Sequence, residues 1–214
     1  MKGIEIEEIR AFVEREIVPR YDGFDAGHGR DHVQTVISQA LSLAEHYPEV
    51  DCCLLLVAAA YHDLGLVNGR EHHHTDSARI VREDMRLRQW FSDDEINTIA
   101  DAAEDHRASS DHEPRTIYGR IVAEADRIID GETIVRRALQ YGMKHEPGLD
   151  REGQYRRLME HMREKYDYGG YLKLWIPHGD NARRLEEFRR TLADEEAFRH
   201  LFDTIYDSLN HLTR

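Results

Sequence analysis

The stretch 53-CLLLVAAAYHDLGL-66 decides the fold of this chain, because a long apolar run ends there on a histidine and a carboxylate side by side. The run predicts a buried helix over about residues 51–63, and Gly65 suits its end. Burying an unpaired carboxylate costs on the order of several kcal/mol. Asp63 therefore needs a cation, a hydrogen-bond network or a metal ion supplied by another part of the chain.

The composition is that of an acidic, globular chain of 214 residues with 33% charged residues and a net charge of −13. Its length fits one domain with an appendage. Binding along a polyanion needs clustered Lys and Arg, which so acidic a chain is poorly suited to provide. We therefore expect no nucleic acid polymer as a partner. A small phosphorylated substrate is compatible with the charge, because a bound cation inverts its sign locally.

Three features predict a cytoplasmic protein without a membrane partner. No apolar run approaches the roughly 18 residues that a membrane span needs. The first ten residues, MKGIEIEEIR, are too acidic and too interrupted for a signal peptide. Cys52 and Cys53 are adjacent inside the apolar run, where they are unsuited to a disulfide and act as small hydrophobic residues.

Helical periodicity runs through the chain, and strand-like alternation is almost absent. The apolar spacing and the positions of Gly, Pro and capping residues predict helices over about residues 4–19, 31–47, 51–63, 75–89, 92–106, 116–130, 132–143 and 154–166, with one or two more after residue 177. The predicted fold is therefore all-α, with a core of five or six helices. We place this core in residues 1–131, and a helical C-terminal extension packed on the core in residues 132–214.

Partners for His62 and Asp63 should lie on other helices and face inward. His32 lies at the start of its helix, beside that helix's inner face, and Asp126 lies near the inner face of a mostly apolar helix. Two histidines and two aspartates form a ligand set suited to a hard or borderline divalent ion. Adjacent helical residues point about 100° apart, so His62 and Asp63 could bind one ion only near a helix end.

These residues lie within three short motifs, 28-HGRDHVQTV-36, 58-AAAYHDLG-65 and 123-AEADRIID-130. In this order, and on helices, the motifs resemble those of the HD-domain superfamily of metal-dependent phosphohydrolases. The resemblance covers about residues 25–130. It implies an HD-domain helical bundle whose metal site hydrolyses phosphate esters or anhydrides, often of nucleotides.

The resemblance also implies further ligands. The segment 74-HTDSARIV-81 resembles a motif by which some HD branches add a histidine, and 104-EDH-106 places another at a helix end. With His74 and His106 the site would have six ligands and could hold two ions bridged by Asp63. His73 could replace His74, and His112 is a further candidate. The expected cofactor is a divalent metal ion (Mn, Fe, Mg, Co or Zn), one or two per chain.

The expected mechanism follows from the metal. A bound ion lowers the pKa of its water toward neutrality and polarises a phosphoryl oxygen. Asp63 would bridge the ions and orient the nucleophile, so we predict Asp63 and His106 as catalytic residues. Clamping phosphate needs arginine near the metal. The arginines nearest to ligands in the sequence, and hence the predicted substrate-binding residues, are Arg30, Arg107 and Arg127.

The sequence thus predicts a metal-dependent phosphohydrolase acting on a small phosphorylated substrate, with a nucleotide as the leading expectation. One alternative is a diiron oxygenase on the same scaffold, which requires that His74 and His106 both bind iron. Another is a non-catalytic nucleotide sensor, against which the intact ligand set argues. A homodimer is compatible with the sequence.

Overall fold

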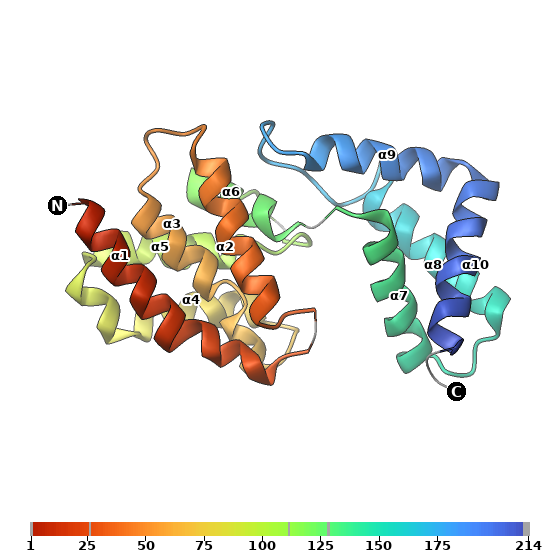
Figure 1. Ribbon diagram of the computed structural model, residues 1–214, viewed down its shortest axis with the longest axis horizontal. Coiled ribbons are helices and arrows are strands. Elements are labelled where there is room, and N and C mark those ends of the chain that lie inside the picture. The colour runs from red at the N-terminus through yellow and green to blue at the C-terminus, as the bar shows by residue number, and fades with distance from the viewer. Residues whose placement is uncertain (1, 26, 111, 128, 212–214) are drawn as a thin grey trace. The chain divides into compact units, whose positions relative to one another are not determined.

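The computed structural model describes residues 2–25, 27–110, 112–127 and 129–211, and these form helices, turns and loops without any strand. The all-α prediction is confirmed. The chain divides into two compact units, the first made of Met1–Arg127 with Trp175–Gly179 and the second of Ile128–Leu174 with Asp180–Arg214 (Figure 1). The boundary after residue 131, and the packing of an extension on the core, stay predictions.

The first unit is built around helix α3. Its elements are α1 (Lys2–Phe12), the π-helix η1 (Val13–Ile17), the 3₁₀ helices η2 (Val18–Gly23), η3 (Leu64–Asn68) and η4 (Met85–Gln89), and the α-helices α2 (Arg30–Ala44), α3 (Cys52–Tyr61), α4 (His73–Glu83), α5 (Asp93–Glu104) and α6 (Ile117–Asp126). Helix α3 contacts α1, α2, α4, α5 and α6. Because it is surrounded by other helices, residues 53–61 are all buried and the helix is apolar on every face.

The starts of three helices of the first unit, α3, α5 and α6, are fixed by side-chain caps. Ser92 and Glu95 form a capping box at the start of α5, as the sequence 92-SDDE-95 indicates. The Thr116 side chain accepts from the backbone N–H of Gly119 at the start of α6, and Asp51 accepts from Cys53 N–H at the start of α3. These caps determine where each helix begins and hence which residues face the core.

Three predicted helices differ in the structure. The helix expected over 116–130 ends at Asp126, because Arg127 adopts an extended conformation. The helix expected over 75–89 ends at Glu83, because Asp84 adopts an extended conformation and starts the 3₁₀ helix η4. The Asp84 carboxylate accepts from the Arg86 backbone and guanidinium and from the Tyr61 hydroxyl. The helix expected over 4–19 changes to π and then 3₁₀ geometry, and Pro19 lies at the start of the 3₁₀ turn.

A short segment, Trp175–Gly179, belongs to the first unit although its neighbours in sequence belong to the second. The backbone N–H of Trp175 donates to the Glu124 carboxylate at 2.8 Å, which gives this fully buried acid a partner. The ring of His178 stacks on that of His46, with centroids 4.7 Å apart. The segment therefore closes over the outer side of α6 and the end of α2.

The second unit is a separate group of four helices, α7 (Gly131–His145), α8 (Arg151–Tyr166), α9 (Asn181–Ala193) and α10 (Glu195–His211). Helix α7 contacts α8 and α10, and α9 contacts α8 and α10. Phe198 and Phe202 of α10 are fully buried, and the Tyr155 ring of α8 meets Phe202 edge-on. Asp130 and Asp150 cap α7 and α8.

By length and hydropathy, none of the individual helices among the described residues could cross a membrane, whereas the bent pair Cys52–Asn68 with His73–Glu83 passes that test. The first member of this pair contains α3, which is the central core helix of the first unit.

Candidate metal centre

The end of α3 explains how His62 and Asp63 can both face the same partners. His62 still has helical backbone angles, whereas Asp63 has φ −107° and ψ 3° and leads into η3. The break turns both side chains toward the same interior region. Tyr21, fully buried on η2, donates its hydroxyl to the Ala60 carbonyl at 2.8 Å and so fixes the last turn.

The two oxygens of Asp63 face two different pairs of histidines. Asp63 Oδ2 lies 3.2 Å from His62 Nε2 and 3.5 Å from His32 Nε2. Asp63 Oδ1 lies 3.4 Å from His106 Nε2 and 3.6 Å from His73 Nε2. The side chain of Asp63 is 4% exposed, so this carboxylate has no access to bulk water. One buried carboxylate is therefore shared by two candidate ligand groups.

The first of these groups, which we call site A, also includes Asp126 at the end of α6. Asp126 Oδ1 lies 3.2 Å from His32 Nε2 and 3.7 Å from His62 Nε2. The four residues that the sequence singled out, His32, His62, Asp63 and Asp126, are thus brought together by α2, α3 and α6. The second group, site B, consists of Asp63, His73 and His106.

Backbone carbonyls orient three of the histidine rings. The Nδ1 atoms of His62, His73 and His106 lie 2.8, 2.8 and 2.6 Å from the carbonyl oxygens of Ala59, Arg70 and Ala103. A carbonyl only accepts, so each Nδ1 carries the proton and each Nε2 is free to bind a metal. His32 Nδ1 is buried without a partner among the described residues.

The distances within each site fit a divalent ion. His32 Nε2 and His62 Nε2 are 3.2 Å apart, and His73 Nε2 and His106 Nε2 are also 3.2 Å apart. Two imidazoles on one ion, each with a metal–nitrogen bond of about 2.0–2.1 Å, have nitrogens roughly 3.0–3.4 Å apart. Two lone pairs facing each other at this distance repel unless a proton or a cation lies between them. The donor set therefore fits a metal at both sites.

The electrostatics keep the two carboxylates ionised. Burial favours neutral Asp63, but the adjacent His62, with His106 and His32, holds the pKa of this carboxyl well below its ordinary value. Burial likewise opposes ionisation of Asp126, but the neighbouring His32 and His62 hold the pKa of Asp126 well below its ordinary value. Burial and the neighbouring His106 lower the pKa of His73 to about 4, so His73 is neutral at pH 7.

Of the two alternatives that the sequence leaves open, the structure brings His73, and not His74, together with Asp63 and His106. His74 Nδ1 instead lies 3.2 Å from Arg107 Nη1, on the side of α4 that faces the end of α5. Adjacent helical residues point about 100° apart, so only one of the pair can face Asp63. The sequence of three consecutive histidines does not indicate which of them faces Asp63.

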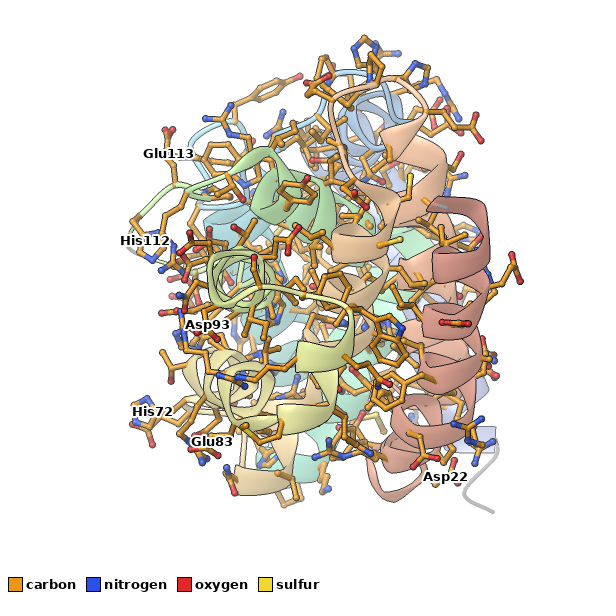
Figure 2. The ribbon with its side chains drawn as sticks, turned by 90° about the vertical axis from the view of Figure 1, so that its left-hand side faces the viewer. Asp22, His72, Glu83, Asp93, His112 and Glu113 are labelled. Carbon is orange, nitrogen blue, oxygen red and sulfur yellow. The ribbon has the colours of Figure 1, made fainter. Side chains whose placement is uncertain are left out.

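The remaining sequence candidates lie outside the two sites. His112 is exposed and projects from the outer surface, as does His72 (Figure 2). Arg30 is exposed and is paired with Asp22 through Nε and Nη2. Arg107 donates to the Glu71 carbonyl at 2.7 Å and contacts His74. Arg127 is buried, and its Nε and Nη1 have no partner among the described residues.

Two residues that sequence reasoning did not select support the centre. One is Tyr21, which holds the end of α3. The other is Gly65, where an added Cβ would lie only 1.9 Å from the His73 carbonyl oxygen. The Gly65 N–H donates to Ser77 Oγ at 2.9 Å, so the chain after Asp63 packs directly on the start of α4. The sequence predicts Gly65 only as a helix end, although this glycine is also needed for the close approach.

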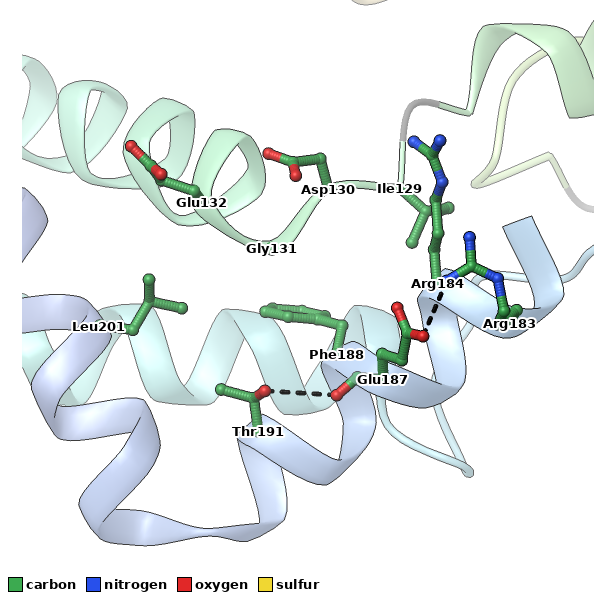
Figure 3. A pocket seen from close by; sticks show the side chains of 10 residues that line it. All are labelled: Ile129, Asp130, Gly131, Glu132, Arg183, Arg184, Glu187, Phe188, Thr191 and Leu201. Atoms are coloured by element: carbon green, nitrogen blue, oxygen red, sulfur yellow. Dashed lines mark hydrogen bonds and ion pairs between the residues drawn. The ribbon is translucent and has the colours of Figure 1, made fainter. Parts of the chain in front are cut away.

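A cavity of about 580 Å³ lies in the second unit, between the start of α7 and helix α9 (Figure 3). Phe188 and Gly131 form part of its wall. Its charged groups largely neutralise one another, since Arg183 Nη1 donates to Glu187 at 2.8 Å and Nη2 lies 3.5 Å from Asp180. No histidine lines it, so the metal chemistry of the described residues belongs to sites A and B.

The fold and the two sites define an all-helical protein with a His/Asp metal centre. The family model of the HD domain matches residues 29–130, a little under half of the chain, and this segment contains every member of sites A and B. HD domains are typical of metal-dependent phosphohydrolases. Comparison with curated proteins and with solved structures finds no match.

Proposed function

We propose that this protein is a phosphohydrolase that cleaves a phosphoester or phosphoanhydride bond of a small phosphorylated molecule at a two-ion centre. The observation that carries the proposal is the buried Asp63 carboxylate, with one oxygen facing His32 and His62 and the other facing His73 and His106. A carboxylate shared in this way is the arrangement expected of a bridging ligand.

The residues of the chain have distinct roles in this proposal. His32, His62 and Asp126 would hold an ion at site A, and His73 and His106 would hold one at site B. Asp63 would contribute a ligand to both sites. The bound metal would supply a water of lowered pKa and polarise the phosphoryl group. Because His32, His62 and Asp63 are almost fully buried, these ligands are held in place and need little reorganisation during the reaction.

Nucleotides are the substrate class that we propose first. The support is the resemblance of the three sequence motifs to a superfamily that often acts on nucleotides. In a chain with a net charge of −13, a bound cation would supply local positive charge that favours a phosphate group. Arg127 remains a proposed substrate-binding residue, because two of its buried nitrogens have no partner among the residues that the structure describes.

The test combines metal analysis with hydrolysis assays on the wild type, Asp63→Ala and His106→Ala. We expect about two ions per wild-type chain, about one in His106→Ala, and activity on phosphorylated substrates that falls at least about 100-fold in Asp63→Ala. Asp93→Ala, which removes an exposed carboxylate of α5 (Figure 2), is the matched control. A fully active Asp63→Ala protein would contradict the proposal.

A diiron oxygenase is the second candidate function. The observation that favours it is the set of four histidines and two aspartates, which includes the site B residues that such chemistry requires. Oxygen uptake by iron-containing protein, without phosphate release, would identify this reaction. A nucleotide sensor would instead bind nucleotide with neither phosphate release nor oxygen uptake.

A further inference from the structure

Arg70 lies in the loop between η3 and α4, directly after a tight turn. The loop turns at Gly69, whose φ of +101° is the one positive value among the described residues. An L-residue with a side chain rarely adopts this conformation, so glycine is favoured there. The turn makes Arg70 the first residue of the segment that leads into His73.

The backbone of Arg70 belongs to site B. Its carbonyl oxygen accepts from His73 Nδ1 at 2.8 Å and thereby aims His73 Nε2 at Asp63 and His106. This contact uses only main-chain atoms of Arg70. A substitution at position 70 that leaves the backbone in place should therefore leave the site B ligands in place.

The side chain of Arg70 contacts His28 and Asp25 instead, and His28 lies next to the site A residue His32. Arg70 Nη2 lies 3.2 Å from His28 Nε2, and Arg70 Nη1 lies 3.6 Å from Asp25 Oδ2. His28 Nδ1 lies 2.7 Å from Asp25 Oδ1, and the His28 ring meets the His32 ring edge-on at 5.9 Å. Because guanidinium only donates, His28 Nε2 accepts from Arg70 while its Nδ1–H donates to Asp25.

The Arg70 guanidinium is therefore connected to site A through His28, while the Arg70 backbone contacts site B. Its side chain is 65% exposed, and beyond His28 and Asp25 its N–H groups have no acceptor among the described residues. Arg30, by comparison, is paired with Asp22. A planar guanidinium with free donors matches the geometry of phosphate oxygens.

We infer that Arg70 binds the phosphate group of the substrate at the rim of the two metal sites, anchored there by the pair Asp25–His28. The inference rests on the proposed function, and it adds a substrate-binding residue that the sequence analysis did not select. Arg70 is a binding residue in this scheme, and Asp25 and His28 are positioning residues that act through it.

The experiment measures the binding of inorganic phosphate to Mn²⁺-loaded protein by titration calorimetry, together with metal content and the KM and kcat for the substrate class on which the wild type is active. The variants are Arg70→Ala, Arg70→Lys and the control Arg79→Ala. Arg79 is an exposed arginine of α4 paired with Asp76 and Glu83, so its loss changes the net charge equally.

We expect Arg70→Ala to bind phosphate about 10- to 100-fold more weakly, since a charge-assisted hydrogen bond is lost, with KM raised and the metal content unchanged. Arg70→Lys should recover part of the affinity, because it keeps the charge without the bidentate geometry. Arg79→Ala should match the wild type.

Normal phosphate binding by Arg70→Ala, or loss of metal from it, overturns the inference. If the wild type hydrolyses phosphorylated substrates while Arg70→Ala binds phosphate normally, only the role of Arg70 fails. If the loaded wild type neither hydrolyses phosphorylated substrates nor binds phosphate, the proposed function fails with it.

Discussion

At the scale of single residues, His73 and His74 form a natural comparison, because they are neighbours with different surroundings. His73 Nε2 faces His106 at 3.2 Å, whereas His74 contacts Arg107. We expect His73→Ala to reduce the metal content from about two ions per chain to about one, and His74→Ala to leave it unchanged. Elemental analysis of both variants, prepared side by side, measures the difference.

The reverse result, with metal lost from His74→Ala alone, would contradict the assignment of site B. Circular dichroism of the two proteins serves as the control for folding. Both residues lie in the first turn of α4, so any general effect of replacing histidine in that turn should be similar in the two variants.

The residues that sequence reasoning could and could not place differ in a physical way. His32, His62, Asp63 and Asp126 each stand beside apolar residues on a helix, so periodicity alone predicts that they face inward. His73 and Arg70 are positioned by the turn at Gly69 and by side-chain contacts with other elements. Local periodicity carries no information about such contacts, so the sequence leaves His73 and His74 as alternatives and gives no reason to select Arg70.

At the scale of elements, the contact between η3 and α4 joins the two metal sites. A Cβ at Gly65 would lie 1.9 Å from the His73 carbonyl oxygen and 2.7 Å from the Ser77 backbone nitrogen. Both are backbone atoms, so the helix itself would have to move. We expect Gly65→Ala to lower the free energy of unfolding by about 3 kcal/mol and to reduce the metal content at site B.

Gly23→Ala is the matched control for that substitution, because nothing lies within 4 Å of its added Cβ. Its unfolding free energy in urea should stay within about 0.5 kcal/mol of the wild type. If Gly65→Ala were as stable as Gly23→Ala and kept all its metal, the contact would not position His73.

The junction between α4 and η4 gives a pH-dependent prediction. Burial opposes ionisation of Asp84, but the hydrogen bonds from Arg86 and Tyr61 hold its pKa below the ordinary value. A carboxyl with a lowered folded-state pKa stabilises the protein above its unfolded pKa, and this contribution is lost as the pH falls through the folded value. The hydrogen bonds of ionised Asp84 should therefore stabilise the protein at neutral pH and contribute less in acid.

We accordingly expect Asp84→Asn to lower the unfolding free energy by about 1–2 kcal/mol at pH 7, with the difference from the wild type shrinking below about pH 4. Urea unfolding at several pH values measures it. A difference that is constant from pH 7 to pH 3 would show that ionisation of Asp84 contributes nothing.

Helices with strong local sequence signals were predicted well, whereas the positions at which a predicted helix breaks were not. The run in α3 and the capping box of α5 depend on local sequence, and both are confirmed. The end of α4 at Glu83 depends on Asp84 accepting a hydrogen bond from Tyr61, which is 23 residues away in sequence. A contact of that range competes with local helix propensity, and sequence patterns do not reveal it.

At the scale of the whole molecule, the two units differ in their relation to metal. Every residue of sites A and B belongs to the first unit, on α2, α3, α4, α6 and the ends adjoining α3 and α5. A ligand that binds only the folded state stabilises it by about 2.7 kcal/mol when its concentration is 100 times its dissociation constant. Metal should therefore stabilise the first unit directly.

Hydrogen exchange measured by mass spectrometry tests this, with protein loaded with Mn²⁺ compared with protein treated with a chelator. We expect metal removal to speed exchange up to about 100-fold in peptides from α2, α3, α5 and α6, because opening these helices separates the ligands. Peptides from α7, α8, α9 and α10 carry none of these ligands and should change much less. Asp63→Ala, treated in the same way, should show no difference between the two conditions in either unit. Equal changes in both units of the wild type would mean that the chain opens as a single cooperative body, and no change in α3 would remove Asp63 from the metal centre.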